Sequence, residues 1–580
     1  MGKAMDISKT DQPEHPRGSY VQALELLAIT LAGAIVFLPY LLHGAPYEDS
    51  YLLNVNWAEG FIQELETGTL YPRWIPSLWD GTGAADFYFY APLPFYVIAG
   101  VKAICGVCDV SHSLAVTGFL LYVLSGFGML GLMRTLRLPG PIVLGAIAFL
   151  LMPYHFDNWA VRQAIGELTA TAFVPYFLWG MVEVLRGRGY LRLAVATGLI
   201  GLSHLPTLLI LGIVSVVLSM TILRPASGRV FLHGLLAGAI GFAAAAIYWL
   251  PAISLLETVN ADALGVYEWR ANMLRPWISE WTSWESKIWL PFLMLSLLTA
   301  FSIASTGRPL THYARLQIAL LCISWFFVTP LSDPVWENTS IDIIQFPWRF
   351  LLVADVAFAM TLPVLWARTI GTVGLPAAWL QWIVGITSVT ATVVLVLSLA
   401  FWWEKPQIPL VLQRALNLKV GALEWLGRSE AAQELSGKEL VKKLSWKELV
   451  KNGLPPIVND PRIVRSTGFS AVIEILETEP LMLRFRATCP TGCTVVLRRG
   501  YWVYWEVRAE ESGSVIPTRP TVGFPLITTN LPTGDAIYRL TLRHPPIERV
   551  AAVISLLAVV AIIGILILDV RSRRGRIRPD

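Results

Sequence analysis

Charged side chains are scarce in this 580-residue chain, where Asp, Glu, Lys and Arg together make up 15% of the residues. A soluble protein carries roughly 25% charged residues, so the shortage excludes an ordinary soluble enzyme. Hydrophobic residues reach 55%. Many apolar runs have the ~20 residues that are needed to cross a bilayer. The composition therefore predicts a polytopic α-helical membrane protein.

Several common motifs are also missing, and each absence argues against one class of function. The first apolar run is too long for a removable signal peptide and lacks a small-residue cleavage site. Gly81-Thr82-Gly83 is not a nucleotide-binding loop, because no strand precedes it. Cys105 and Cys108 lack the second close pair that a zinc site needs. The first loop has no Asp-x-Asp, so no metal requirement is indicated, although a divalent cation stays open as a cofactor.

Basic residues predict which connections face the cytoplasm, because Lys and Arg concentrate on that side. Arg134 and Arg137 lie inside only if a single span crosses between His43 and Arg134. That span is placed at 113–133, so the apolar stretch 91–107 is predicted to be an interfacial or re-entrant helix. Both chain ends are then cytoplasmic, with about twelve spans. The predicted spans are 21–42, 113–133, 140–153, 168–185, 192–204, 207–223, 231–250, 287–304, 314–331, 347–367, 376–402 and 549–569.

The connections on the two predicted sides differ in length, since the inner ones are short and basic. The long outer connections are 43–112, 154–166, 251–286, 332–346 and 403–548. Functional residues concentrate on long loops held by a rigid scaffold, so any chemistry is expected on the outer face. The predicted domains are a cytoplasmic tail at 1–20, a transmembrane domain at 21–402, an outer segment at 403–548, a final span at 549–569 and a basic tail at 570–580.

The outer segment 403–548 is predicted to be a separate domain. Residues 404–450 have a helical pattern, and short alternating runs separated by Pro and Gly follow from about Ile463. Such runs are typical of a β-sandwich, here of about 80 residues. Cys489 and Cys493 lie in this domain, where oxidising conditions are expected, and they predict a disulfide that closes a tight turn.

The first outer loop, 43–112, contains the most informative stretch. Glu48 and Asp49 follow the first span closely, and residues 52–65 have the apolar spacing of an amphipathic helix. One of the two carboxylates is a candidate general base that takes the proton from an acceptor hydroxyl during sugar transfer. The alternative is structural, because Asp49 could simply cap the helix that follows it.

A second set of ionisable residues lies at the ends of predicted spans. Asp157, Arg162 and Glu167 stand at the mouth of one span, where ionisable groups are either functional or paired. The spacing of Arg162 and Glu167, about one and a half helical turns, does not require them to pair. His204 is either a ligand or a hydrogen-bonded packing residue.

Arg349 opens a predicted span from the outer side, against the positive-inside trend, so a partner should neutralise it. A phosphate of a lipid carrier fits, because guanidinium groups bind phosphate through two hydrogen bonds. The alternatives are a salt bridge to Asp342 or Asp355, or a side chain that reaches toward the membrane surface.

Five segments occur in the order found in a known family: TGTLYPRWIPSLWDGTGAADFYFYAPLPFY, MPYHFDNWAVRQAIGELTA, SHLPT, YWLPA and QFPWRF. They resemble bacterial polytopic proteins labelled 6-pyruvoyl-tetrahydropterin-synthase-related membrane proteins, which are similar in turn to the GT-C glycosyltransferases. The segment YWVYWEV…LPTGDAIYRLTLRHPP resembles the β-domain that closes YfhO-like membrane proteins. Together these resemblances cover nearly the whole chain.

GT-C enzymes take sugars from polyprenyl-phosphate carriers on the outer membrane face, and an essential acid follows their first span. The resemblance therefore implies that Asp49 and Glu48 are catalytic, with Asp157 as a further acid. It also implies an arginine near the carrier phosphate, which Arg349 or Arg162 would supply. The complete set of expected substrate- and phosphate-binding residues is Arg349, Arg162, Glu167, His204, Arg73, Tyr90, Gln345 and Trp348.

These observations lead to the hypothesis of a GT-C-type glycosyltransferase in a bacterial inner membrane. It would transfer a sugar from a polyprenyl-phosphate donor to a hydroxyl of a glycan, lipid or protein acceptor, with no nucleic-acid partner. One alternative is a non-catalytic scaffold or lipid-handling protein. Another is a transporter of lipid-linked glycans, which the nearly apolar spans 207–223 and 376–402 disfavour.

Overall fold

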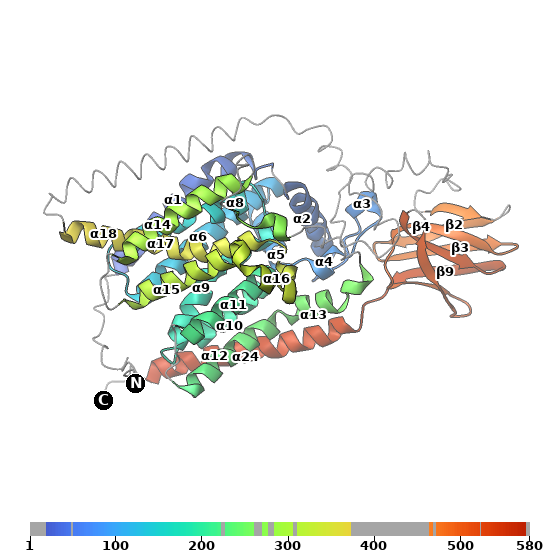
Figure 1. Ribbon diagram of the computed structural model, residues 1–580. Helices are drawn as coiled ribbons and strands as arrows, with labels where there is room; N and C mark the ends of the chain where they lie inside the picture. Colours follow the sequence, from blue (N-terminus) through green and yellow to red (C-terminus); the bar gives the residue numbers. More distant parts are fainter. Residues whose placement is uncertain are drawn as a thin grey trace.

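The structure is a computed structural model of the chain, shown in Figure 1. It describes residues 19–47, 50–221, 227–259, 269–275, 284–304, 310–372, 463–467, 471–521 and 524–575. Glu48, Asp49, the predicted span 376–402 and the predicted helical segment 404–450 lie outside the described residues.

A helical part precedes a β-domain, and a last helix follows the β-domain (Figure 1). The α-helices of the first part are α1 Ser19–His43, α2 Tyr51–Glu66, α3 Leu78–Gly81, α4 Asp86–Phe89, α5 Leu93–Cys105, α6 Val110–Leu136, α7 Ile142–Leu150, α8 Pro153–Ala160, α9 Ile165–Val184, α10 Tyr190–Gly201, α11 Leu205–Thr221, α12 Gly228–Ala244, α13 Ala246–Ser254, α14 Trp284–Ala304, α15 His312–Val328, α16 Asp333–Asn338, α17 Leu351–Ala359 and α18 Thr361–Thr372. Short 3-10 helices are η2 Leu256–Thr258, η4 Trp269–Asn272, η5 Pro330–Ser332, η6 Ser340–Ile344 and η7 Pro347–Phe350. The last helix is α24 Ile547–Gly575.

Five helices among the described residues are long and apolar enough to cross a membrane, or up to seven if each of two bent pairs counts as one span. All five match predicted spans. Four are single helices, namely α1, α6, α9 and α24, and the fifth covers Pro347–Arg368. The predicted span 140–153 differs, because α7 ends at Leu150 and Pro153 begins a separate helix, α8. Shorter apolar helices occupy other predicted spans, so the count of twelve stays a prediction.

The stretch 91–107 forms a single helix, α5, of 13 residues. At 1.5 Å per residue it is about 20 Å long, too short for a hydrocarbon core of about 30 Å. The helix α10, in a predicted span, is just as short, so the interfacial or re-entrant placement of α5 stays a prediction. The helix α2 matches the predicted amphipathic segment, but three of its polar residues, Asn54, Asn56 and Glu64, are buried, while Gln63 and Glu66 are exposed. The loop that follows covers it: a Cβ atom on Gly60 would come within 2.3 Å of Ile75.

The predicted span 231–250 is broken into α12 and α13, which meet at an angle of 71°. Pro251 in α13 has no N–H, so the Ile247 carbonyl lacks its helical donor. Arg73 Nη2 of the first loop donates to that carbonyl over 2.8 Å. The Ile247 N–H, which lies in the first turn and has no helical acceptor, donates to Ser555 Oγ of α24 over 2.7 Å. The break therefore joins α13 to the first loop and to the last helix, which lies alongside it in Figure 1.

The predicted outer connections meet at one end of the helical part. The Ser50 N–H of connection 43–112 donates to the Arg162 carbonyl of connection 154–166 over 3.3 Å. Trp502 Nε1 of the β-domain donates to Thr258 Oγ1 of connection 251–286 over 2.9 Å. The side of the membrane on which this end lies stays a prediction.

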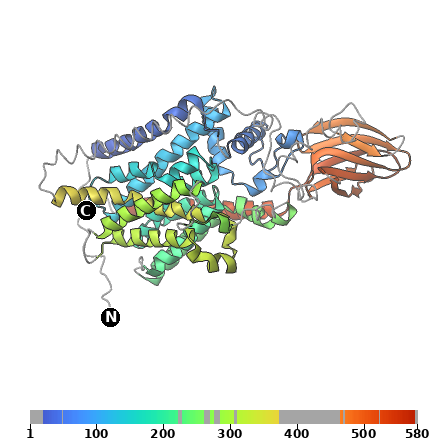
Figure 2. The same cartoon turned by 45° about the horizontal axis from the view of Figure 1, so that its top comes forward.

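The β-domain, drawn in orange and red at one end of the molecule in Figure 2, consists of two antiparallel sheets. One sheet has the strand order β1-β4-β8-β7 and the other the order β2-β3-β9-β5-β6. The strands are β1 Ile463–Thr467, β2 Val472–Glu479, β3 Met482–Cys489, β4 Cys493–Gly500, β5 Trp505–Ala509, β6 Val515–Ile516, β7 Thr518–Thr521, β8 Phe524–Leu531 and β9 Gly534–Leu542. Buried side chains of both sheets, such as Phe485 and Ile527, belong to one hydrophobic cluster, which gives a sandwich core.

The β-domain contacts the first outer loop through aromatic side chains and close backbone approaches. Trp74 stacks on Trp502, with ring centroids 6.2 Å apart. The Gly500 N–H donates to the Thr82 carbonyl over 2.7 Å. A Cβ atom on Gly500 would come within 2.3 Å of the Gly83 carbonyl oxygen, so no larger residue fits there without a shift.

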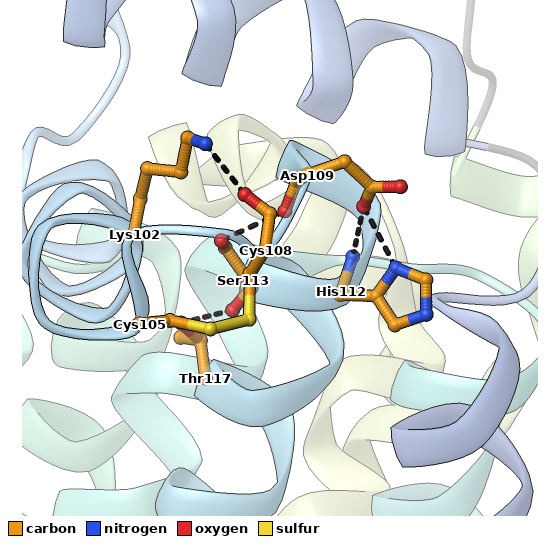
Figure 3. Close-up of a disulfide and its surroundings, with 7 residues drawn as sticks. All are labelled: Lys102, Cys105, Cys108, Asp109, His112, Ser113 and Thr117. Atoms are coloured by element: carbon orange, nitrogen blue, oxygen red, sulfur yellow. Dashed lines mark hydrogen bonds and ion pairs between the residues drawn. A yellow bond between two sulfur atoms is a disulfide. The ribbon is translucent and has the colours of Figure 1, made fainter.

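Two disulfides are present. Cys489 and Cys493, the pair predicted from the sequence, are joined across the turn between β3 and β4. Cys105 and Cys108 are joined at the end of α5, where Lys102 Nζ donates to the Cys108 carbonyl over 2.5 Å (Figure 3). Asp109 next to this disulfide accepts the His112 backbone N–H over 2.7 Å and so caps α6 (Figure 3).

Candidate functional site

Glu167, in the first turn of α9, is the centre of a buried polar cluster. Its side chain is 1% exposed. Tyr154 Oη donates to Glu167 Oε1 over 2.5 Å. Arg162 Nη1 and Arg349 Nε lie 3.2 and 3.3 Å from Oε2 of the same carboxylate. Two guanidinium groups therefore share one buried carboxylate.

Arg349 reaches Glu167 from η7, 182 positions further along the chain. Its Nη1 also donates to the Ile344 carbonyl, and it lies 3.4 Å from Gln345 Oε1. Arg349 therefore pairs with the carboxylate of Glu167, rather than with Asp342 or Asp355, the two carboxylates considered from the sequence. Trp348 next to it stacks on Phe346, with ring centroids 4.6 Å apart.

Arg162 and Glu167 pair although their sequence spacing did not require it. α9 begins at Ile165, so Arg162 precedes the helix and is not bound by helical spacing. Gln163 has φ 49°, in the left-handed region that non-glycine residues rarely adopt, and it turns the chain just before the helix. Arg162 Nη1 also bonds Tyr154 Oη over 2.9 Å and Asn158 Oδ1 over 2.6 Å.

The helix α8 carries Tyr154, Asp157 and Asn158, and a side chain of α17 bonds its first turn. Asp355 Oδ2 of α17 accepts the His155 backbone N–H over 2.9 Å. This N–H is one of those at a helix start that have no partner within the helix, so Asp355 caps α8 from another element. The His155 Nδ1–H bonds the Phe149 carbonyl over 3.1 Å, and burial lowers the pKa of this imidazole to about 4. Asp157 is buried at 7% exposure.

Electrostatics favour one protonation state for the residues of the second outer connection. Burial raises the pKa of the Tyr154 hydroxyl well above its ordinary value, and the charge of Glu167 adds to this effect. Burial alone lowers the pKa of Arg162, but Tyr154, Glu167 and Asp157 outweigh it, and the net pKa lies above the ordinary value. Tyr154 therefore stays a donor and Arg162 stays a cation throughout the physiological pH range.

The first outer loop meets this cluster at the start of α2. The Ser50 N–H bonds the Arg162 carbonyl, and Asn54 Nδ2 donates to the Gln163 carbonyl over 2.6 Å. Ser50 directly follows Glu48 and Asp49 in the sequence. The segment after the two predicted catalytic acids is thus fixed to the residue that carries one of the two guanidinium groups.

Two further predicted residues lie at the edge of the cluster. A Cβ atom on Gly166 would come within 3.0 Å of the Ser203 carbonyl oxygen and 3.3 Å of Tyr90 Oη. Tyr90 therefore lies next to the first turn of α9. His204 Nδ1 accepts the Thr207 backbone N–H over 3.3 Å and lies 2.8 Å from Thr207 Oγ1. An Nδ1 that accepts a backbone N–H leaves the proton of a neutral imidazole on Nε2.

Arg73 occupies a different cluster, between the first loop and the last helix. It donates to the Ile247 carbonyl, lies 3.9 Å from Glu548 Oε2 and stacks over the Tyr71 ring at 3.9 Å. Tyr88 Oη also bonds Glu548. Arg73 therefore supplies a hydrogen-bond donor to the backbone at the α12–α13 break, a role that its sequence position did not indicate.

The structure adds Tyr154, Asn54, Asn158 and Gln163 to the residues that the sequence singled out. Tyr154 and Asn158 fall within the quoted segment MPYHFDNWAVRQAIGELTA and are four positions apart, so they share one helix face. That spacing was the available signal for these two. Within the described ranges no group of three or more His, Cys, Asp or Glu side chains is arranged to hold a metal ion.

The helices and the buried charge cluster define a helical membrane protein with a β-domain at one end. A family model described as 6-pyruvoyl-tetrahydropterin synthase related domain, a membrane protein, matches residues 87–407, more than half of the chain. The chain therefore belongs to this family of membrane proteins. No curated protein matches it.

Two solved structures are among those similar to the chain. The arabinofuranosyltransferase AftD from mycobacteria is 15% identical with a TM-score of 0.44, and the match covers 64% of this chain and 26% of that one. ArnT from Cupriavidus metallidurans, bound to undecaprenyl phosphate, is 12% identical with a TM-score of 0.27, over 60% of this chain and 78% of that one. The chain thus spans about a quarter of the length of the arabinofuranosyltransferase.

Proposed function

We propose that the protein is a membrane-embedded glycosyltransferase of the bacterial inner membrane that acts on the extracytoplasmic face. The observation that carries the proposal is the junction of the first and second outer connections. There Ser50, the residue after Asp49, bonds the carbonyl of Arg162, whose side chain joins Arg349 at Glu167. The residue that follows the candidate base in the sequence is therefore hydrogen-bonded to the backbone of one of the two candidate phosphate-binding arginines.

The donor in this proposal is a polyprenyl-phosphate-linked sugar. A guanidinium carries five N–H donors in a planar fork that matches phosphate oxygens. Arg162 and Arg349 carry more such donors than the single carboxylate of Glu167 can accept. Glu167 holds the two cations together, so phosphate binding does not first have to overcome their mutual repulsion.

The chemical step is a displacement at the anomeric carbon of the donor sugar. Asp49 takes the proton of the acceptor hydroxyl, and the acceptor oxygen forms a bond to the anomeric carbon. The bond from that carbon to the phosphate oxygen breaks, and the lipid phosphate leaves with the electron pair. Glu48 or Asp157 orients the acceptor, while Arg349 and Arg162 stabilise the negative charge of the departing phosphate.

The test is a transfer assay in membranes with radiolabelled undecaprenyl-phosphate sugars and a mixture of candidate acceptor glycans and lipids. A positioned general base contributes typically 10²–10⁴-fold, so Asp49→Asn should lower transfer by about that factor. Asp342→Asn is the matched control, because it makes the same change at an exposed position in connection 332–346. Running both with EDTA and with added Mg²⁺ also decides whether a divalent cation takes part. Full transfer by a normally folded Asp49→Asn protein would refute the base assignment.

A second candidate is a non-catalytic scaffold, and one observation favours it. Both guanidinium groups already have an anionic partner in Glu167, as expected for a purely structural network. A wild-type protein that binds no undecaprenyl phosphate, measured by native mass spectrometry in detergent, would support the scaffold. Saturable binding that falls about tenfold in Arg349→Met, at unchanged binding of a neutral polyprenol, would support the transferase.

A further inference from the structure

Three amide side chains are buried next to the charge cluster with unmet hydrogen-bonding groups. Asn54, Asn158 and Gln163 are 1%, 0% and 2% exposed. Among the described residues no partner meets Oδ1 of Asn54, Nδ2 of Asn158, or either Oε1 or Nε2 of Gln163. Buried polar side-chain atoms are normally paired, so such a group of exceptions in one place needs a physical reason.

Hydrogen bonds through the backbone connect the three residues that carry these amides. Asn54 Nδ2 donates to the backbone carbonyl of Gln163 over 2.6 Å, and the Ala164 N–H donates to the backbone carbonyl of Asn158 over 3.0 Å. Asn158 Oδ1 accepts from Arg162 Nη1 over 2.6 Å, so the amide is oriented with its NH₂ group directed away from the guanidinium. The side-chain contacts of Asn54 and Asn158 each fix one end of the amide and leave the other end available.

Gln163 differs from its neighbours because both ends of its amide are unmet, and its backbone is also strained. The value of φ, 49°, lies in the left-handed region that glutamine rarely adopts. Strain and unmet polar groups persist in folded proteins chiefly at sites where function requires them. Gln317, a buried amide between α15 and α17, shows the ordinary case: its Nε2 donates to the Ala357 carbonyl over 3.0 Å and to Thr361 Oγ1 over 3.2 Å.

The unmet atoms comprise NH₂ donors on Asn158 and Gln163 and carbonyl acceptors on Asn54 and Gln163. A phosphate offers only acceptor oxygens, so it would leave the two amide oxygens unmet. A hydroxyl both donates and accepts, and neighbouring hydroxyls on a ring can engage one amide through both its ends. The chemistry of these amides therefore favours a neutral ligand with several hydroxyls over an anion.

We propose that Asn54, Asn158 and Gln163 bind the hydroxyl groups of the sugar ring of the lipid-linked donor. This inference rests on the proposed glycosyltransferase function and assigns the recognition of the sugar to these amides, apart from the phosphate. Arg162 connects the two parts of the site, because one of its nitrogens bonds both Asn158 and Glu167. Gln163 is the main specificity determinant, since it presents a donor and an acceptor together.

The test compares lipid binding by the full-length wild type and by Gln163→Met in detergent, using native mass spectrometry. The probes are undecaprenyl phosphate and undecaprenyl phosphate carrying glucose, mannose or arabinose. The wild type should bind at least one sugar-bearing lipid about tenfold more tightly than the bare lipid phosphate. Gln163→Met removes both polar groups at similar volume, so it should abolish this preference while binding the bare phosphate as well as before.

Gln317→Met is the matched control, since it makes the same change at a satisfied amide. It should lower the thermal unfolding temperature without altering the preference for sugar-bearing lipid. Gln163→Met should not lower that temperature, because the Gln163 amide has no partner to lose among the described residues. Destabilisation of Gln163→Met comparable to the control would overturn the inference, as it would show that the amide has a structural partner.

The other outcomes separate the inference from the proposed function. Equal binding of sugar-bearing and bare lipid by the wild type would overturn the sugar site and leave lipid-phosphate binding intact. A preference that survives Gln163→Met would show that the amides hold water only. Binding of a free acceptor glycan that Gln163→Met weakens, with donor binding unchanged, would overturn the assignment to the donor. Binding of neither lipid would overturn both proposals together.

Discussion

The protein contains the same ionic motif, one carboxylate shared by two arginines, in both buried and more exposed surroundings. Glu167 accepts from Arg162 and Arg349 with its side chain 1% exposed, between helices. Glu510 accepts from Arg484 and Arg539 with its side chain 23% exposed, on the outer surface of a β-sheet. Burial separates the two cases, because an uncompensated buried charge costs far more than a solvated one. The motif alone therefore does not reveal its energetic importance.

The largest expected effect is that of Glu167→Gln. The change keeps the size of the side chain but leaves the charges of Arg162 and Arg349 uncompensated in a buried site. Removing one partner of a buried ion pair costs about 3–5 kcal/mol. The free energy of unfolding in mixed detergent, followed by denaturant titration, should fall by about that amount.

Glu337→Gln is the control for this experiment. Glu337 pairs with Arg270 and has a side chain that is 46% exposed, so the same change should have little effect. If Glu167→Gln and Glu337→Gln lowered the free energy of unfolding equally, burial would not be what makes the Glu167 pairs more important than the exposed pair.

A smaller effect is expected from Tyr154→Phe, which leaves all charges in place. It removes the donor to Glu167 Oε1 and one acceptor of Arg162 Nη1. Hydrogen bonds to charged groups contribute about 1.5–3 kcal/mol, so a loss of about 2 kcal/mol in unfolding free energy is expected. Tyr176→Phe, which removes a bond of 3.1 Å to the neutral Leu124 carbonyl, should cost less. The reverse order would show that the Glu167 carboxylate does not strengthen its bonds.

Sequence patterns predicted the parts of this molecule that depend on local periodicity. The alternation of apolar residues predicts strands at 471–476, 481–487, 494–497, 501–507 and 536–542, where the structure has β2, β3, β4, β5 and β9. The helical spacing of residues 52–65 predicts α2. β8 was missed, since its sequence FPLITTNL contains a proline and a polar end that break the alternation. Hydropathy located α1, α6, α9 and α24, but it could not show that α12 and α13 are separate, bent helices.

The candidate site was predicted less completely, because long-range contacts build it. Glu167, Arg162 and Arg349 stood out as ionisable residues near apolar segments, yet the pairing of Arg349 with Glu167 joins residues 182 positions apart. Asn54 and Gln163 lie 109 positions apart, and neither has a charge or a motif that marks it in the sequence. The roles proposed for Glu48 and Asp49 stay predictions, since both residues lie outside the described part of the chain.

The exposed pairs should respond to acid. The hydrogen bond from Arg543 holds the pKa of Glu506 below its ordinary value, and that from Arg484 does the same for Glu510. A carboxylate whose pKa is lower in the folded state stabilises the fold above its unfolded pKa of about 4.3, and this contribution is lost as the pH falls through the folded value. Protection of the β3 and β9 amides from hydrogen exchange in the full-length protein, corrected for intrinsic rates, should therefore decrease below about pH 4. Protection that is constant down to pH 2 would contradict the expectation.

The smallest expected effect, that of Glu510→Gln at pH 7, completes the comparison with Glu167→Gln. Glu510 bonds Arg484 and Arg539 with good geometry, at 2.8 Å in each pair, so geometry alone would predict a large loss. Water solvates both arginines once the carboxylate is gone, and salt already screens the pair over about 10 Å at 0.1 M. We therefore expect no measurable change in the unfolding midpoint, and a smaller decrease in β3 and β9 protection than acid causes, because Glu506 keeps its charge and its arginine partners at pH 7. Arg486→Gln, on the same sheet face, should behave alike, because its partner Asp535 is also exposed. A loss as large as that of Glu167→Gln would show that the exposed arginines act as one coupled network whose strength depends on charge arrangement rather than burial.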